Sequence, residues 1–160
     1  MVPSDLVGYF TAAATAAAGL LGLLFVAVSL RPESIFGSQA EDRSRRTANS
    51  AFTALVNAFF LSLWALLPSI NLGWVALVLG VTCAAATVKL RLHTLGGRPA
   101  LGLMAVSVAL YCAQAVMGAL VIAHPHASRD IRVLAYLTLV SFSVALFRAW
   151  TLLATPAPAA

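Results

Sequence analysis

The chain has 160 residues, of which 61% are hydrophobic and only 9% are charged. A soluble domain carries about 25% charged residues, so this composition excludes an ordinary soluble fold and predicts one transmembrane domain over residues 1–160. The net charge of +5 comes mainly from basic residues between hydrophobic runs. It therefore argues against nucleic-acid binding and indicates orientation in a lipid bilayer.

Five hydrophobic runs predict an all-α fold, a polytopic transmembrane helix bundle with five spans. The runs cover residues 6–30, 48–68, 72–90, 100–123 and 131–154, and roughly 20 apolar residues suffice to cross a bilayer core of about 30 Å. The first run is longer than the core of a signal peptide, and no Lys or Arg precedes it. We therefore expect it to remain in the protein as a span.

The first span is rich in small residues. Thr15 with Gly19, and Ala18 with Gly22, are pairs of small residues four positions apart, a spacing that lets another helix backbone approach closely. These four residues are our candidates for close helix packing. The alternative is a narrow pore lined by Ala, Thr and Gly.

The second helix is predicted to start in water and to finish across the membrane. Ser38 and Glu41 have the spacing of a capping box, and the charged segment QAEDRSRRT then continues into an apolar run that ends at Pro68. The helix should therefore extend into the cytoplasm. Asn57 lies at the middle of the span, where it needs a partner from a neighbouring helix.

The later spans carry small or polar residues on single faces. Residues 80–87, GVTCAAAT, form a patch in the third span that we expect to pack against the first span or a neighbouring subunit. Helical spacing gives two polar stripes, one in the fourth span and one in the fifth: Ser107, Tyr111, Gln114 and Gly118, and Thr138, Ser141, Ala145 and Arg148.

Basic residues are divided unequally between the two sides that five spans define. One side, which includes the end of the fifth span, holds eight of the ten: Arg31, Arg43, Arg45, Arg46, Lys89, Arg91, Arg98 and Arg148. The other side holds Arg129 and Arg132. Because cytoplasmic loops carry the excess of Lys and Arg, we expect a multi-pass protein of the cell inner membrane with its N-terminus outside and its C-terminus cytoplasmic.

The spans lack the groups that common catalytic and metal sites require. All five carboxylates lie in predicted tails or loops, which argues against proton relays and calcium selectivity. His124 and His126 have no carboxylate or cysteine nearby in this interpretation, so they form an incomplete metal site and read more simply as an interfacial loop. No catalytic or dinucleotide motif stands in a suitable context. We expect no enzyme activity, no cofactor and no bound metal.

One part of the chain carries a family resemblance. Residues 19–30, GLLGLLFVAVSL, the basic segment after them and a second span ending in ALLP at Pro68 resemble an uncharacterised group of small bacterial multi-span inner-membrane proteins. Some of these are labelled modulators of a membrane protease. The resemblance covers the first half of the chain and implies interaction rather than catalysis. The Trp and Pro pattern of the five-span translocator protein family is missing.

Two functions are consistent with these features. Five thin helices leave little interior volume, so we expect self-association into a homo-oligomer that acts as a channel or permease for a small anion or neutral solute. Its polar path would use Asn57, Tyr111, Gln114, Ser141 and Arg148. The alternative is a non-catalytic assembly factor or regulator that binds another membrane protein through the first span and the start of the second helix. The same polar residues would then be contacts between helices, with Arg148 extending to the interface.

Overall fold

The part of the protein that the structure describes is a bundle of five α-helices. The computed structural model describes residues 2–30, 42–68, 70–92, 101–124 and 128–153, and these residues form no strand. The helices are α1 (Ser4–Leu30), α3 (Asp42–Ala65), α4 (Leu72–Leu92), α5 (Leu101–Ala123) and α6 (Ser128–Leu153). All five are long and apolar enough to cross a membrane. The predicted all-α, five-span fold is confirmed, and the chain is a multi-pass integral membrane protein.

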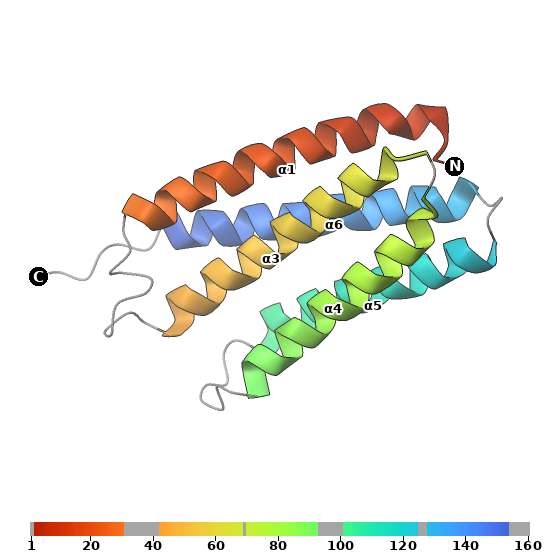
Figure 1. Ribbon diagram of the computed structural model, residues 1–160. Helices are drawn as coiled ribbons and strands as arrows, with labels where there is room; N and C mark the ends of the chain where they lie inside the picture. Colours follow the sequence, from red (N-terminus) through yellow and green to blue (C-terminus); the bar gives the residue numbers. More distant parts are fainter. Residues whose placement is uncertain (1, 31–41, 69, 93–100, 125–127, 154–160) are drawn as a thin grey trace, which may run out of the picture.

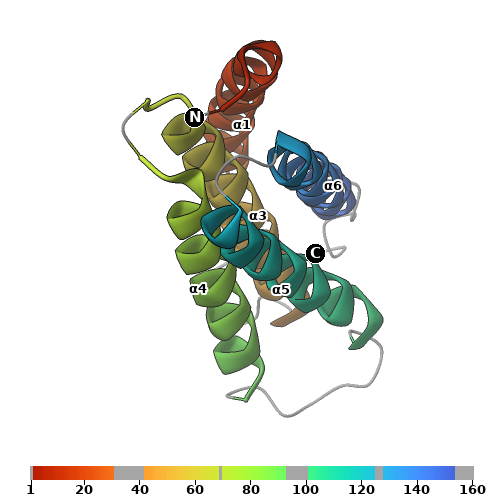
Figure 2. The same cartoon turned by 90° about the vertical axis from the view of Figure 1, so that its right-hand side faces the viewer.

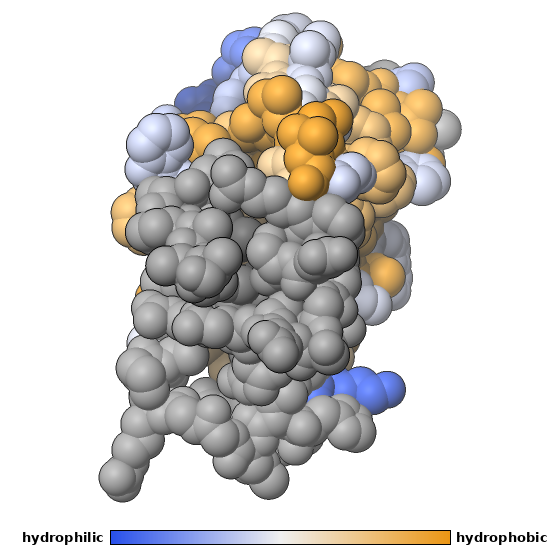
Figure 3. Space-filling view, turned by 90° about the vertical axis from the view of Figure 1, so that its left-hand side faces the viewer, coloured by the Kyte–Doolittle hydropathy of each residue, from blue (hydrophilic) through white to orange (hydrophobic). Residues whose placement is uncertain are grey.

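Large apolar side chains lie on the outside of the bundle. Phe25 is 70% exposed, and Tyr136 and Trp150 are each 68% exposed. Figure 3 shows that the described surface near one end of the bundle is largely hydrophobic. Water would disfavour so much exposed apolar surface, whereas lipid chains solvate it. The exposed apolar surface therefore agrees with the membrane location that the composition predicts.

The helices run back and forth between two ends of the bundle. The start of α1 lies at one end, which we call the N-terminal end, and the end of α6 lies at the other, the C-terminal end (Figure 1). α3 packs against α1, α4 and α6, while α5 packs against α4 and α6. In the described part of the chain, α1 and α4 do not contact each other. The prediction that residues 80–87 pack against the first span of the same chain is therefore wrong, because α3 lies between the two helices.

The buried apolar core has two parts. The first cluster lies toward the N-terminal end and draws residues from all five helices: Phe10, Leu61, Ala65, Leu72, Ala76, Val121, Ile131, Leu134 and Ala135. The second lies toward the C-terminal end and comes from α1, α3 and α6: Leu24, Ala51, Ala54, Leu55 and Ala145. We call them the N-terminal core and the C-terminal core. The buried residues of the C-terminal core include none from α4 or α5.

Glycine residues allow α4 and α5 to approach backbone to backbone. A Cβ atom added at Gly118 would lie 2.5 Å from the backbone nitrogen of Leu77, and one at Gly80 would lie 2.7 Å from the carbonyl oxygen of Tyr111. Gly73 is equally restricted, because its Cβ would lie 2.7 Å from the carbonyl oxygen of Gly118. Backbone atoms cannot move aside as a flexible side chain can. The two helices therefore pack so closely that these positions have no room for a side chain larger than the hydrogen atom of glycine.

The turn between α3 and α4 begins earlier than predicted. α3 ends at Ala65, before the predicted boundary at Pro68, because its last turn tightens into bonds from Leu66 to Leu63 and from Leu67 to Trp64. Proline also disfavours a helical residue before it. Asn71 then caps α4, with its Oδ1 accepting a hydrogen bond from the amide of Gly73 at 2.9 Å. The predicted cap at Ser38 and Glu41 lies outside the described residues.

Candidate functional site

The two mid-membrane amide side chains bind each other. Asn57 lies near the middle of the α3 span and Gln114 near the middle of the α5 span. Asn57 Nδ2 donates to Gln114 Oε1 at 2.8 Å, and Gln114 Nε2 donates back to Asn57 Oδ1 at 3.1 Å. Gln114 Nε2 also lies 3.4 Å from the carbonyl oxygen of Ala76 in α4. Each amide is 1% exposed, so the pair satisfies most of its polar atoms inside the protein.

A buried arginine forms the second polar contact. Arg148 of α6 donates from Nη2 to the hydroxyl oxygen of Ser107 in α5 at 2.6 Å, and both residues are buried. The phenol of Tyr111, one turn along α5, lies within electrostatic range of the guanidinium. Arg148 lies within the candidate span Arg129–Trp150, near its end, and charged side chains within membrane spans are rare and costly. The burial of Arg148 among hydroxyl groups therefore marks this position as a functional candidate.

The two contacts and the buried Tyr111 lie along one face of α5, and we call their residues the polar seam: Asn57, Ser107, Tyr111, Gln114 and Arg148. It lies between α3 and α6 on one side and α5 on the other. The backbones of α3 and α5 do not contact each other, so only side chains span the distance between these two helices. The i, i+4, i+7 spacing along α5 turns all three of its seam residues to the interior.

Other buried polar groups lie near the seam without extending it. Ser141 of the predicted path is buried in α6, about two turns from Arg148 in the direction of the N-terminal end. The hydroxyl of Thr138 donates a hydrogen bond to the carbonyl oxygen of Leu134 in the same helix at 2.8 Å. The hydroxyl oxygen of Ser62 in α3 is buried without a hydrogen-bond partner. The polar character of the interior therefore weakens toward the N-terminal core.

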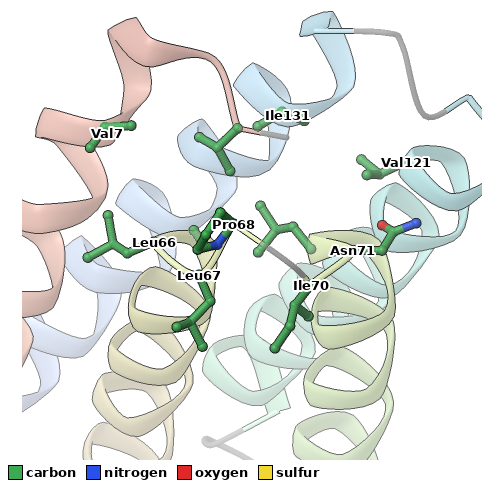
Figure 4. Close-up of a pocket in the computed structure, with 11 residues that line it drawn as sticks. Val7, Leu66, Leu67, Pro68, Ile70, Asn71, Val121 and Ile131 are labelled. Atoms are coloured by element: carbon green, nitrogen blue, oxygen red, sulfur yellow. The ribbon is translucent and has the colours of Figure 1, made fainter.

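A pocket opens at the N-terminal end of the bundle (Figure 4). It has a volume of about 350 Å³, and its wall includes Val7 of α1, Val121 of α5, Ile131 of α6 and the connection from α3 to α4. Asn71 contributes a polar side chain to a wall that is otherwise mainly apolar. Because Ala65, Leu72, Val121 and Ile131 also belong to the N-terminal core, this core lies between the pocket and the polar seam.

The predicted close-packing residues of α1 lie on its exposed side. Thr15, Ala18, Gly19 and Gly22 are all exposed, and a Cβ at either glycine would meet no atom within 4 Å. The hydroxyl of Thr15 donates to the carbonyl of Thr11 in the same helix at 3.0 Å. Among the described residues, no atom lies within 4 Å of the positions that a Cβ would take at Gly19 and Gly22, so this face is open to lipid or to another protein.

His124, which directly follows α5, lies near a carboxylate that the sequence analysis did not expect. His124 Nδ1 lies 4.0 Å from Asp130 Oδ2, because the start of α6 returns toward the end of α5. The interpretation that no carboxylate lies near this histidine is therefore wrong. His126 lies outside the described residues. The described residues contain no group of three His, Cys, Asp or Glu side chains that could hold a metal ion.

The predicted polar path shares Asn57, Tyr111, Gln114 and Arg148 with the seam, whereas Ser107 was predicted only as part of the α5 stripe. The close contact of Gly73, Gly80 and Gly118 between α4 and α5 was not predicted. The signal was available, since Gly73 and Gly80 are seven residues apart on one face of α4 and Gly118 lies on the stripe of α5. Comparison with known proteins gives no match, whether with family models, curated proteins or solved structures.

Proposed function

We propose that this protein is a homo-oligomeric permease of the bacterial inner membrane, in which the polar seam of each subunit conducts a small anion or neutral solute. The observation that carries the proposal is the burial of Arg148, with Ser107 and Tyr111, in the same seam as the mid-membrane amide pair. Buried ionisable groups in membrane spans mark ion and substrate paths. A cationic group in the path favours anions and neutral molecules over divalent cations.

The proposal includes an orientation. Eight of the ten Lys and Arg residues belong to the side of the C-terminus, which supports a cytoplasmic C-terminal end and an external N-terminal end. The pocket beside Asn71 would then face the outside. The inner half of the seam, at Ser107 and Arg148, would face the cytoplasm.

Self-association is supported by the exposed side of α1. Gly19 and Gly22 have open space where a side chain would be, and small residues at this spacing let a second helix approach closely in lipid. A symmetric assembly would pair this face with another subunit. The proposal involves no catalytic step, since the five seam residues include no carboxylate, histidine or lysine that could activate the hydroxyls of Ser107 and Tyr111.

Flux in liposomes tests the proposed transport. Purified protein is reconstituted, and the vesicles are assayed separately for chloride efflux, glycerol-driven swelling and potassium efflux. We expect chloride or glycerol flux above that of empty vesicles, with no matching potassium flux, and a reduced chloride flux in Arg148→Gln. Rates equal to those of empty vesicles for all three solutes would refute the permease.

The second candidate is a non-catalytic regulator or assembly factor that binds another membrane protein through α1. It is favoured by the direct contact between Asn57 and Gln114, which leaves no room for a solute between the two amides in this conformation. It also agrees with the resemblance to proteins labelled as modulators of a membrane protease. Under this alternative, Gly19→Leu would abolish binding to the other membrane protein, and Arg148→Gln would leave that binding intact.

A further inference from the structure

The five helices form two groups that the chain connects at one end only. We call α1, α3 and α6 the three-helix group, and α4 with α5 the two-helix group. The chain passes between the groups twice, from α3 to α4 and from α5 to α6. The helix ends that flank both passages lie at the N-terminal end (Figures 1 and 2). The other two connections, α1 to α3 and α4 to α5, each stay within one group.

The apolar packing has the same asymmetry. The N-terminal core includes buried residues from all five helices, and so from both groups. Among the side chains that the structure describes, the buried residues of the C-terminal core come from the three-helix group alone. In a membrane, association of helices is driven largely by close van der Waals packing of their side chains. This packing therefore joins the two groups most firmly at the N-terminal end.

Two polar contacts join the groups away from the N-terminal core. Asn57 and Gln114 meet at mid-membrane, and Arg148 meets Ser107 toward the C-terminal end. Polar bonds between membrane helices contribute little net stability, because the separated groups find other partners. Water that enters from the C-terminal end can supply those partners, so separation in this half leaves the polar groups satisfied.

We propose that the two-helix group swings about the N-terminal core and opens the polar seam toward the C-terminal end. The two-helix group moves as a unit, because Gly80 and Gly118 interlock α4 with α5 against backbone atoms. The role of the movement rests on the proposed function: it would admit a solute to the seam from the cytoplasmic side. The N-terminal core stays closed meanwhile and separates the seam from the external pocket, so the two ends do not open together.

Two distances across the seam test this movement. Spin labels are placed on exposed positions near the C-terminal end, with Val88→Cys in α4 and Phe147→Cys in α6. The matched pair near the N-terminal end is Trp74→Cys in α4 and Tyr136→Cys in α6. All four side chains are exposed. The background carries Cys83→Ala and Cys112→Ala, and labelled chains are diluted with unlabelled chains in liposomes so that distances within one subunit dominate.

We expect two distances for the C-terminal pair and one distance for the N-terminal pair in pulsed electron paramagnetic resonance. Ser107→Ala removes the oxygen that accepts from Arg148, so it should raise the ratio of long to short distances about threefold, the change expected for loss of one average interhelical bond in a membrane. The N-terminal pair should not respond. A single C-terminal distance that Ser107→Ala leaves unchanged would overturn the proposal, as would equal changes in both pairs.

Flux of chloride and glycerol in the same liposomes separates this proposal from the proposed function. Flux with a fixed C-terminal distance rejects the swinging movement and leaves the permease standing. Two C-terminal distances without any flux support the movement and reject the permease. A single fixed C-terminal distance without flux rejects both proposals.

Discussion

The interlock between α4 and α5 predicts that Gly118→Ala destabilises the bundle. The added methyl group would lie 2.5 Å from the backbone nitrogen of Leu77 and 2.7 Å from the carbonyl oxygen of Gly73. Neither atom can rotate away, so the helices must separate by a fraction of an ångström along their contact. That separation also loosens Ala76, whose carbonyl lies beside Gln114 Nε2.

The expected loss of stability follows from two opposing terms. Overpacking a well-packed interior costs about 1–3 kcal/mol. Replacing glycine by alanine within a helix returns up to about 1 kcal/mol through helix propensity. We therefore expect Gly118→Ala to lower the free energy of unfolding by up to about 2 kcal/mol, because the steric term is the larger one. Gly8→Ala is the matched control, since its methyl group would meet no atom within 4 Å.

Unfolding in mixed micelles measures this difference. The folded protein in dodecylmaltoside is titrated with sodium dodecyl sulfate, and helicity and tryptophan fluorescence are followed together. Gly118→Ala should unfold at a lower fraction of denaturing detergent than the parent protein, and Gly8→Ala at the same or a higher fraction. If the two variants unfold together, the close approach of α4 and α5 is not a determinant of stability, and our reasoning about the interlock is wrong.

Three further results are expected. The first is a double-mutant cycle of Asn57→Leu and Gln114→Leu, measured by the same unfolding titration. The double variant should lose less stability than the sum of the two single losses, with a coupling energy of about 0.6 kcal/mol. Strict additivity would exclude a direct bond. Gly19→Leu should reduce the oligomer mass in light scattering without changing the unfolding midpoint, and an unchanged mass would exclude α1 as the contact. In a variant with Cys83→Ala and Cys112→Ala, a membrane-impermeant thiol reagent should label His124→Cys from outside and Lys89→Cys from the cytoplasmic side; labelling of both from one side would contradict the topology.

The spans were predictable because the membrane imposes a strong and local rule. A helix that crosses lipid needs about 20 apolar residues whatever it packs against, so the run lengths alone located all five helices. The seam residues of α5 were also predictable as a stripe, because polar groups in lipid turn inward and the helical repeat is fixed. Their partners were not. That Gln114 meets Asn57, and Arg148 meets Ser107, depends on how the helices cross.

The buried side of α1 shows why packing faces are harder to predict in a membrane. In a soluble helix the polar side marks the solvent, but both sides of α1 are made of small and apolar residues. Ala14 and Ala17 are buried, whereas Ala18 one position later is exposed. No hydropathy contrast separates them. The small-residue rule identifies surfaces that a helix can approach without saying whether that helix belongs to the same chain.

The division between an apolar core at one end and polar contacts toward the other also bears on the choice between permease and regulator. A regulator that acts only through α1 would need a stable bundle behind it, and apolar residues along the whole junction would provide that without the cost of burying Arg148. A permease needs the two helix groups to stay in contact at one end. At the other end, their polar side chains must be able to exchange hydrogen bonds within the protein for hydrogen bonds to water. The placement of Arg148, Ser107 and the amide pair along that junction, away from the N-terminal core, is therefore easier to explain by passage of a solute than by support of a docking face.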